Sequence, residues 1–194
     1  KLIETSVSCS NMVGKRNYAI LLLATRLGFR ASDIAFLSFA NLDWENSRIL
    51  FKQYKTGQET ELPLLADIGE AIINYLKFGR VRSDSTRLFL SARAPYRPMT
   101  GSAVSSAVRQ IIDASGISIG QRRHGPHAMR HSLAGRLLEH SVSLPVISES
   151  LGHKKTESTM VYLRIDTKAL RQCALDVPMV SMSFYSQIGG VFYE

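Results

Sequence analysis

The sequence feature that most constrains the fold is a largely apolar segment, Asn17–Leu27, that ends at Gly28. Its longest uninterrupted apolar run is Ala19–Ala24, far shorter than the roughly 20 residues that a helix needs to cross a bilayer. We therefore expect a helix buried inside a folded domain rather than in a membrane. Gly28 is expected to be the residue after the end of that helix, where glycine is favoured.

Composition and cysteine content exclude several classes of protein. The chain has 194 residues, of which 45% are hydrophobic and 21% charged, so it can bury a sizeable core without disulfides. Its two cysteines, Cys9 and Cys173, form no C-x-x-C motif. The first ten residues lack the apolar run of a signal peptide. These features argue against secreted, membrane-spanning and disordered proteins, and favour a reducing, cytoplasmic location.

The remaining pattern predicts an α+β fold that is mostly helical and has one small antiparallel sheet. Arg48–Lys52 and Glu59–Leu64 have strand character and flank Lys55-Thr56-Gly57, which predicts a hairpin with the lysine in its turn. Leu88–Leu90 is a candidate edge strand. Ser32 is expected to cap a short helix that runs through Phe39. Further helices are expected at Ala66–Phe78, Ser102–Ala114, Pro126–His140, Leu144–Leu151 and Thr156–Leu163.

Charge gives the first indication of a partner. There are 24 Lys and Arg residues against 16 Asp and Glu residues, which gives a net charge of +8 and a pI near 9.7. A folded domain this basic favours a polyanionic partner, most often a nucleic acid.

Several short motifs then occur in a distinctive order. An arginine and a carboxylate lie in Gly28-Phe29-Arg30-Ala31-Ser32-Asp33, and the hairpin lysine follows. Next come the H-x-x-R motif at 127–130, whose two basic residues share one helix face, and Leu151-Gly152-His153. A tyrosine nine residues after that histidine completes the set: Arg30, Lys55, His127, Arg130, His153 and Tyr162.

In this order and spacing the chain resembles the catalytic domain of the tyrosine recombinases, the phage integrase family. That family has an arginine in G-[LF]-R-x-[ST]-[DE], a hairpin lysine, H-x-x-R, L-G-H and the late tyrosine. The resemblance covers about residues 12–172 and implies a catalytic domain at 1–174. The helical core-binding domain that family members usually carry at the N-terminus is expected to be absent. The aromatic-rich segment 175–194 is expected to dock on a neighbouring protomer, with packing on its own domain as the alternative.

The resemblance implies a role for each motif residue, and the chemistry of the side chains agrees. Tyr162 would be the nucleophile, because a phenol ionises more readily than an alcohol and is also a workable leaving group. Arg30 and Arg130 would hold the phosphate, since a planar guanidinium binds two oxygens at once. Lys55 would protonate the leaving 5′ oxygen. His127 would accept the proton of the tyrosine.

Three further residues have expected supporting roles. His153 would donate a hydrogen bond to a phosphate oxygen. Asp33 and His131 would orient the catalytic side chains. The spacing of His124, His127 and His131 also suits a metal, but no cysteine lies nearby, so we expect neither a metal site nor a cofactor.

The predicted function is site-specific DNA strand exchange through a 3′-phosphotyrosyl intermediate. The alternatives are a topoisomerase-like enzyme that nicks and reseals DNA, and a catalytically idle DNA-binding regulator. The expected partner is double-stranded DNA, bound by a homo-tetramer on paired sites. The basic residues expected to contact phosphates flank the motifs: Lys52, Arg97, Arg122, Arg123, Lys154 and Lys155.

Overall fold

A computed structural model of the chain describes residues 11–118 and 124–152. Its central element is the predicted apolar helix, α2, which spans Met12–Arg26. The helix begins five residues before the predicted start because Asn11 caps it: the Asn11 Oδ1 accepts a hydrogen bond of 2.7 Å from the Gly14 amide. Gly28 follows the C-cap residue Leu27, so its predicted position just after the helix end is confirmed, and its φ of +64° is left-handed.

The next helix, α3, corrects one prediction. It spans Ala31–Phe36, and its N-cap residue is Arg30 rather than Ser32. The turn at Gly28 brings the chain back early enough for Ala31 to be helical, so Ser32 already lies in the first turn. Phe39 is not part of α3 either, because the chain is extended at Leu37 and a separate 3₁₀ turn, η1, spans Phe39–Asn41.

The small sheet has three antiparallel strands in the order β1-β2-β3, namely Leu42–Asp43, Arg48–Lys52 and Glu59–Pro63. The predicted hairpin is confirmed, with Arg48 opposite Pro63 and Lys52 opposite Glu59. The two-residue β1 is too short to give a sequence pattern. The predicted edge strand at 88–90 is replaced by two isolated bridges, Ser38 to Arg87 and Leu90 to Pro98.

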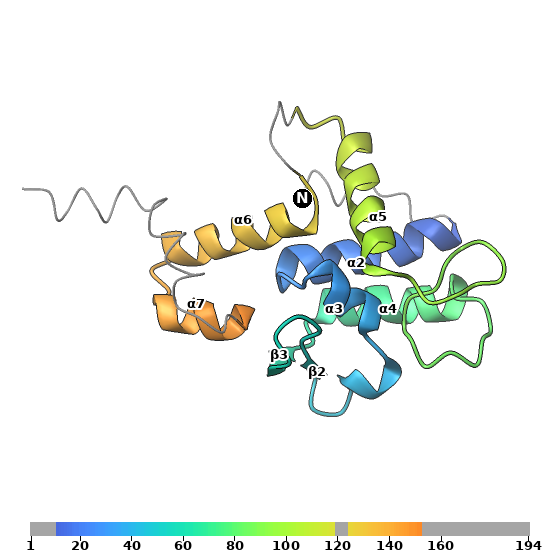
Figure 1. Cartoon of the computed structure of the whole chain (residues 1–194), viewed down its shortest axis with the longest axis horizontal. Helices are drawn as coiled ribbons and strands as arrows, with labels where there is room; N and C mark the ends of the chain where they lie inside the picture. The colour runs from blue at the N-terminus through green and yellow to red at the C-terminus, as the bar shows by residue number, and fades with distance from the viewer. Residues whose placement is uncertain (1–10, 119–123, 153–194) are drawn as a thin grey trace, which may run out of the picture.

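Four further helices follow the sheet. They are α4 (Ala66–Phe78), α5 (Gly101–Ala114), α6 (Pro126–Glu139) and α7 (Leu144–Leu151). Of these, α4, α5 and α6 pack against α2. All four were predicted, and the bounds of α4 and α7 agree with the prediction. Figure 1 shows α2 between α4 and α5, with α6 extending from this group and α7 lying beside α6. The predicted helix 156–163 and the segment 175–194 lie outside the described residues.

The apolar core is divided unequally. The large cluster is built on α2, in which every residue from Ala19 to Ala24 is fully buried, and it includes side chains from α3, α4, α5 and the sheet. The small cluster lies between α6 and α7 and has three buried members, Ala134, Ile147 and Leu151. No helix in the described residues is long and apolar enough to cross a membrane.

Candidate active site

Four of the six predicted catalytic residues lie in the described part of the chain, and they gather where α3, the β2–β3 hairpin and α6 meet. Arg30 caps α3, Lys55 lies in the hairpin turn, and His127 and Arg130 lie near the start of α6. Partial burial and the positive charges of Arg130, Arg30 and Lys55, in that order of effect, lower the pKa of His127. His153 and Tyr162 lie outside the described residues.

Arg130 is buried, with 5% of its surface exposed. Its Nη1 donates to the Gly28 carbonyl oxygen at 2.8 Å, and its Nη2 donates to the Leu151 carbonyl oxygen. The guanidinium therefore joins the end of α2 to the end of α7. Gly28 is required here for two reasons: its φ is positive, and an added Cβ would lie 3.0 Å from the Leu133 Cδ2 atom.

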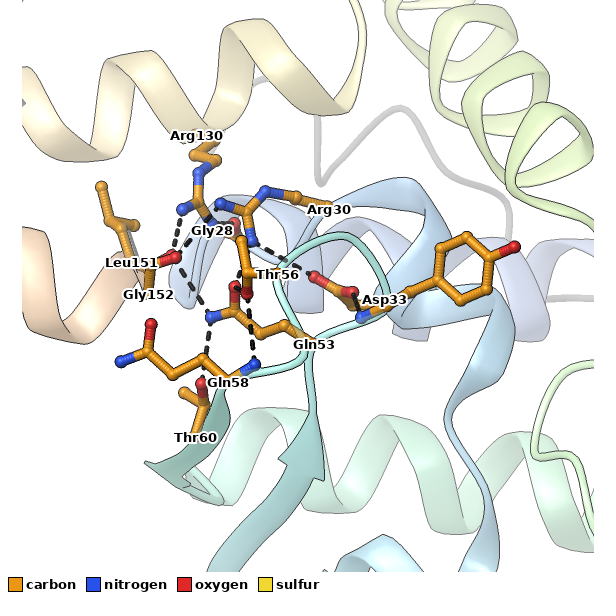
Figure 2. Close-up of polar contacts among 11 residues, drawn as sticks. Gly28, Arg30, Asp33, Gln53, Thr56, Gln58, Thr60, Arg130, Leu151 and Gly152 are labelled. Atoms are coloured by element: carbon orange, nitrogen blue, oxygen red, sulfur yellow. Dashed lines mark hydrogen bonds and ion pairs between the residues drawn. The ribbon is translucent and has the colours of Figure 1, made fainter. Parts of the chain in front are cut away.

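Arg30 is oriented by three partners, as Figure 2 shows. Its Nη1 donates to the Gln53 Oε1, and its Nη2 lies 3.4 Å from the Gly152 carbonyl oxygen. The Asp33 carboxylate lies 3.7 Å from Nη1, and its other oxygen accepts from the Tyr54 amide at 2.9 Å. The predicted neighbourhood of Arg30 and Asp33 is therefore present, and Asp33 also ties α3 to the hairpin.

Gln53 is a site residue that sequence reasoning missed. It is 3% exposed, although it stands in a polar hairpin that the sequence presents as solvated. Besides Arg30 it contacts Thr56, Thr60 and the Leu151 carbonyl oxygen. Nothing in the local sequence indicates this burial, because the end of α7, which covers Gln53, lies far along the chain.

His127 and His131 form a pair one turn apart on α6. Their Nε2 atoms are 2.8 Å apart, so one ring donates a hydrogen bond and the other accepts it. The pKa of His131 is lowered by partial burial and by the charges of His127 and Arg130. Both rings are therefore mainly neutral at pH 7, the state in which an imidazole can accept a proton.

The hairpin turn exposes Lys55. A hydrogen bond of 2.8 Å from the Gly57 amide to the Gln53 carbonyl oxygen closes this turn, and Gly57 has a φ of +68°. Among the predicted phosphate-contacting residues, Lys52 ends β2 and Arg97 lies in the loop before α5, and both are exposed. The others lie outside the described residues: Arg122, Arg123, Lys154 and Lys155.

No group of three or more His, Cys, Asp or Glu residues in the ranges 11–118 and 124–152 is arranged to hold a metal ion. His124, whose spacing suggested a metal ligand, has its Nε2 2.9 Å from the Oδ1 of Asp113 on α5.

The chain is similar in sequence to several known proteins. The model of the phage integrase family matches residues 1–169. A putative integrase/recombinase, y4gC, of Sinorhizobium fredii is 38% identical over 88% of this chain and 87% of its own length. A second one from that organism, y4rA, is 39% identical over 90% of this chain and 42% of its own length. The tyrosine recombinase XerA of Pyrococcus furiosus is 27% identical over 81% of this chain and 53% of its own length.

Solved structures show the same fold. The crystal structure of a XerA recombinase superimposes with a TM-score of 0.72 and 22% identity, over 89% of this chain and 60% of that one. The structure of XerH bound to its difH substrate in a post-cleavage complex superimposes with a TM-score of 0.74 and 23% identity. The match covers 89% of this chain and 49% of the XerH chain. The chain thus spans less than two thirds of y4rA and both XerA chains, but most of y4gC. On its sequence match and its fold, the chain belongs to the phage integrase family.

Proposed function

We propose that this chain catalyses site-specific DNA strand exchange through a covalent 3′-phosphotyrosyl intermediate. The observation that carries the proposal is the convergence of Arg30, Lys55, His127 and Arg130, which are widely separated in sequence. Relatives named tyrosine recombinases and a neighbouring structure in a post-cleavage DNA complex support it. Those names favour recombination over the topoisomerase-like and regulatory alternatives.

The polar contacts support a phosphate-binding role for the two arginines. Arg130 donates to backbone carbonyl oxygens, and the nearest acceptor of Arg30 is a neutral amide. These neutral acceptors orient each guanidinium, and a fixed positive charge stabilises the additional negative charge of the transition state. In this proposal both arginines bind non-bridging oxygens of the scissile phosphate.

Cleavage then requires two proton transfers. The phenolic oxygen of Tyr162 attacks phosphorus, and its proton passes to neutral His127. The bond between phosphorus and the 5′ oxygen breaks, and the Lys55 ammonium donates a proton to that oxygen. His153 donates a hydrogen bond to a phosphate oxygen, and His131 orients His127 through the contact between their rings. Attack of a 5′ hydroxyl on the phosphotyrosine reverses these steps and joins the strands.

We further propose the partners and domain organisation that the family implies. The substrate is double-stranded DNA held by a homo-tetramer, and the protein is cytoplasmic and associated with DNA. Residues 1–174 form the catalytic domain, and segment 175–194 docks on a neighbouring protomer. The residues that contact DNA phosphates are Lys52, Arg97, Arg122, Arg123, Lys154 and Lys155.

The test is a nicked duplex of the cognate site that traps the covalent complex. Wild-type protein should give an adduct that survives denaturation, and peptide mapping should assign it to Tyr162. Tyr162→Phe should give no adduct but bind the duplex normally, because only the phenolic oxygen is lost. Tyr54→Phe is the matched control, since it removes an exposed phenol from the hairpin and keeps the ring that stacks on Phe36. An adduct in Tyr162→Phe would contradict the assignment.

A further inference from the structure

Gln53 joins three segments that carry the predicted catalytic residues. It lies in the hairpin that carries Lys55, beside Arg30 at the start of α3 and against the end of α7. An added Cβ at Gly152, which has a φ of +59°, would collide with the Gln53 amide. The helix α7 therefore ends directly on this side chain. Figure 2 shows Gln53 at the centre of these contacts.

Both the nitrogen and the oxygen of the Gln53 amide form hydrogen bonds, and these bonds fix the orientation of the amide. The Nε2 donates to the Thr60 Oγ1 at 3.0 Å and lies 3.4 Å from the Leu151 carbonyl oxygen. The Oε1 accepts from the Thr56 Oγ1 at 2.9 Å and from the Arg30 Nη1. Because the Leu151 carbonyl can only accept, the amide nitrogen faces α7 and the amide oxygen faces Arg30.

Arg30 has a neutral acceptor as its nearer partner, in addition to its longer ion pair with Asp33. The Arg26 Nε lies 3.1 Å from an Asp67 carboxylate oxygen, whereas the carboxylate nearest Arg30 is 3.7 Å from it and also accepts the Tyr54 amide. A carboxylate in place of Gln53 would hold the guanidinium and cancel its charge. An amide holds the guanidinium and leaves its charge available to an anion.

We propose that Gln53 is the positioning residue of Arg30: its amide oxygen orients the guanidinium for the scissile phosphate without neutralising it. This inference rests on the proposed recombinase function. It deepens that function by assigning a role to a side chain outside the recognised motifs. The amide also fixes the position of Arg30 relative to the Lys55 hairpin and to the turn at Gly152.

Two substitutions separate orientation from charge. Gln53→Met keeps the length of the side chain and removes both hydrogen-bonding ends. Gln53→Glu keeps an acceptor for Arg30 and adds a negative charge. We expect each to slow single-turnover cleavage of the nicked duplex by ~10-fold or more, since loss of a whole oxyanion donor costs ~10²–10³-fold. Gln58→Met is the matched control in the same hairpin, where the hydrogen bonds of Gln58 in the described residues come from its backbone.

A second readout does not depend on cleavage. The guanidinium NMR signals of Arg30, recorded in the full chain without DNA, report how freely its head group rotates. We expect restricted rotation in the wild type and in Gln53→Glu, and faster rotation in Gln53→Met. If Gln53 only held Arg30 in place, Gln53→Glu would also hold it, and this variant would then cleave DNA at the wild-type rate. Thermal unfolding of each variant shows whether it folds. If Gln53→Met does not fold, the cleavage rate of Gln53→Glu tests the proposal.

The outcomes are distinguishable. Cleavage by Gln53→Glu within 3-fold of the wild-type rate would overturn the role of neutrality, and unchanged Arg30 rotation in Gln53→Met would overturn the positioning role. If the wild-type chain forms no adduct with DNA, the proposed function fails. The Arg30 signals then still decide whether Gln53 positions this arginine.

Discussion

The two apolar regions of the molecule differ in how they are held together. The region around α2 is a continuous core to which α3, α4, α5 and the sheet contribute fully buried side chains. The α6–α7 region has a cluster with only three buried members. Its junction with the α2 region combines the packing of Met129 against the large core with directed polar contacts, among them those of Arg130 with Gly28 and of Gln53 with Leu151.

Stability and site geometry therefore have different origins in this molecule. Apolar burial is non-directional and scales with area, so the α2 region supplies most of the stability. Hydrogen bonds of charged groups depend on direction and distance, so the junction aligns the side chains of the site. Substitutions in the two regions should therefore affect different measurements.

The largest expected effect on stability comes from the centre of the large core. Leu22 on α2 is fully buried. Leu22→Ala should lower the free energy of unfolding by about 3–5 kcal/mol, because it loses buried area and leaves a cavity. Urea denaturation followed by circular dichroism measures the loss. A loss below about 1 kcal/mol would contradict the assignment of stability to this region.

At the junction, Arg130→Met should reduce single-turnover DNA cleavage by about 10²–10³-fold, the usual consequence of losing a donor to a developing oxyanion. Duplex binding should fall much less. Arg136→Met is the matched control on the same helix, because Arg136 is exposed and its side chain donates to the Thr25 carbonyl oxygen at 3.4 Å. Equal loss of cleavage in both variants would show that any change in α6 disturbs the site.

A smaller effect is expected when the same substitution, isoleucine to valine, is made in each of the two clusters. Ile20 and Ile147 are both fully buried, the first in the large core and the second in the small cluster. Each change to valine removes one methylene, which typically costs about 0.5–1.5 kcal/mol. Ile20→Val should shift the urea midpoint of the whole chain. Ile147→Val should mainly speed hydrogen exchange of the α6 and α7 amides.

That comparison has a clear contrary result. If Ile147→Val slows or leaves unchanged the exchange in α6 and α7, and shifts the urea midpoint as much as Ile20→Val does, then the two clusters unfold as one unit. The division between a stabilising region and a more loosely attached one would then be wrong.

The smallest effect is a pH dependence of stability from the histidine pair. The pKa values of His127 and His131 lie below 6.5 in the folded chain, so the unfolded chain binds more protons as pH falls through 6.5. Stability is therefore greatest above pH 6.5 and declines as pH drops toward the folded pKa values. The His127→Gln, His131→Gln double variant should show a smaller decline in melting temperature between pH 7 and pH 5. An unchanged decline would exclude this pair as its source.

Elements with local sequence signals were predicted correctly. The bounds of α4 agree with the prediction because its apolar residues repeat with the helical period, and the hairpin agrees because two short strand-like segments flank a glycine turn. Ser32 is the counterexample: it has the chemistry of a cap, but the turn at Gly28 moves the helix start to Arg30. Cap assignments depend on where the chain turns, which a residue type alone does not decide.

The resemblance to the tyrosine recombinases also predicted Arg30, Lys55, His127 and Arg130 as one site, and the structure brings them together. The burial of Gln53 and the partners of Arg130 follow instead from the packing of distant segments. Gln53 is separated in sequence by 98 residues from Leu151, and Arg130 by 102 from Gly28. Such contacts depend on how distant segments pack, and the residues adjacent to them in sequence carry no signal of it. Periodicity and turns are set by neighbouring residues, whereas the alignment of a charged group is set by whatever the fold brings against it.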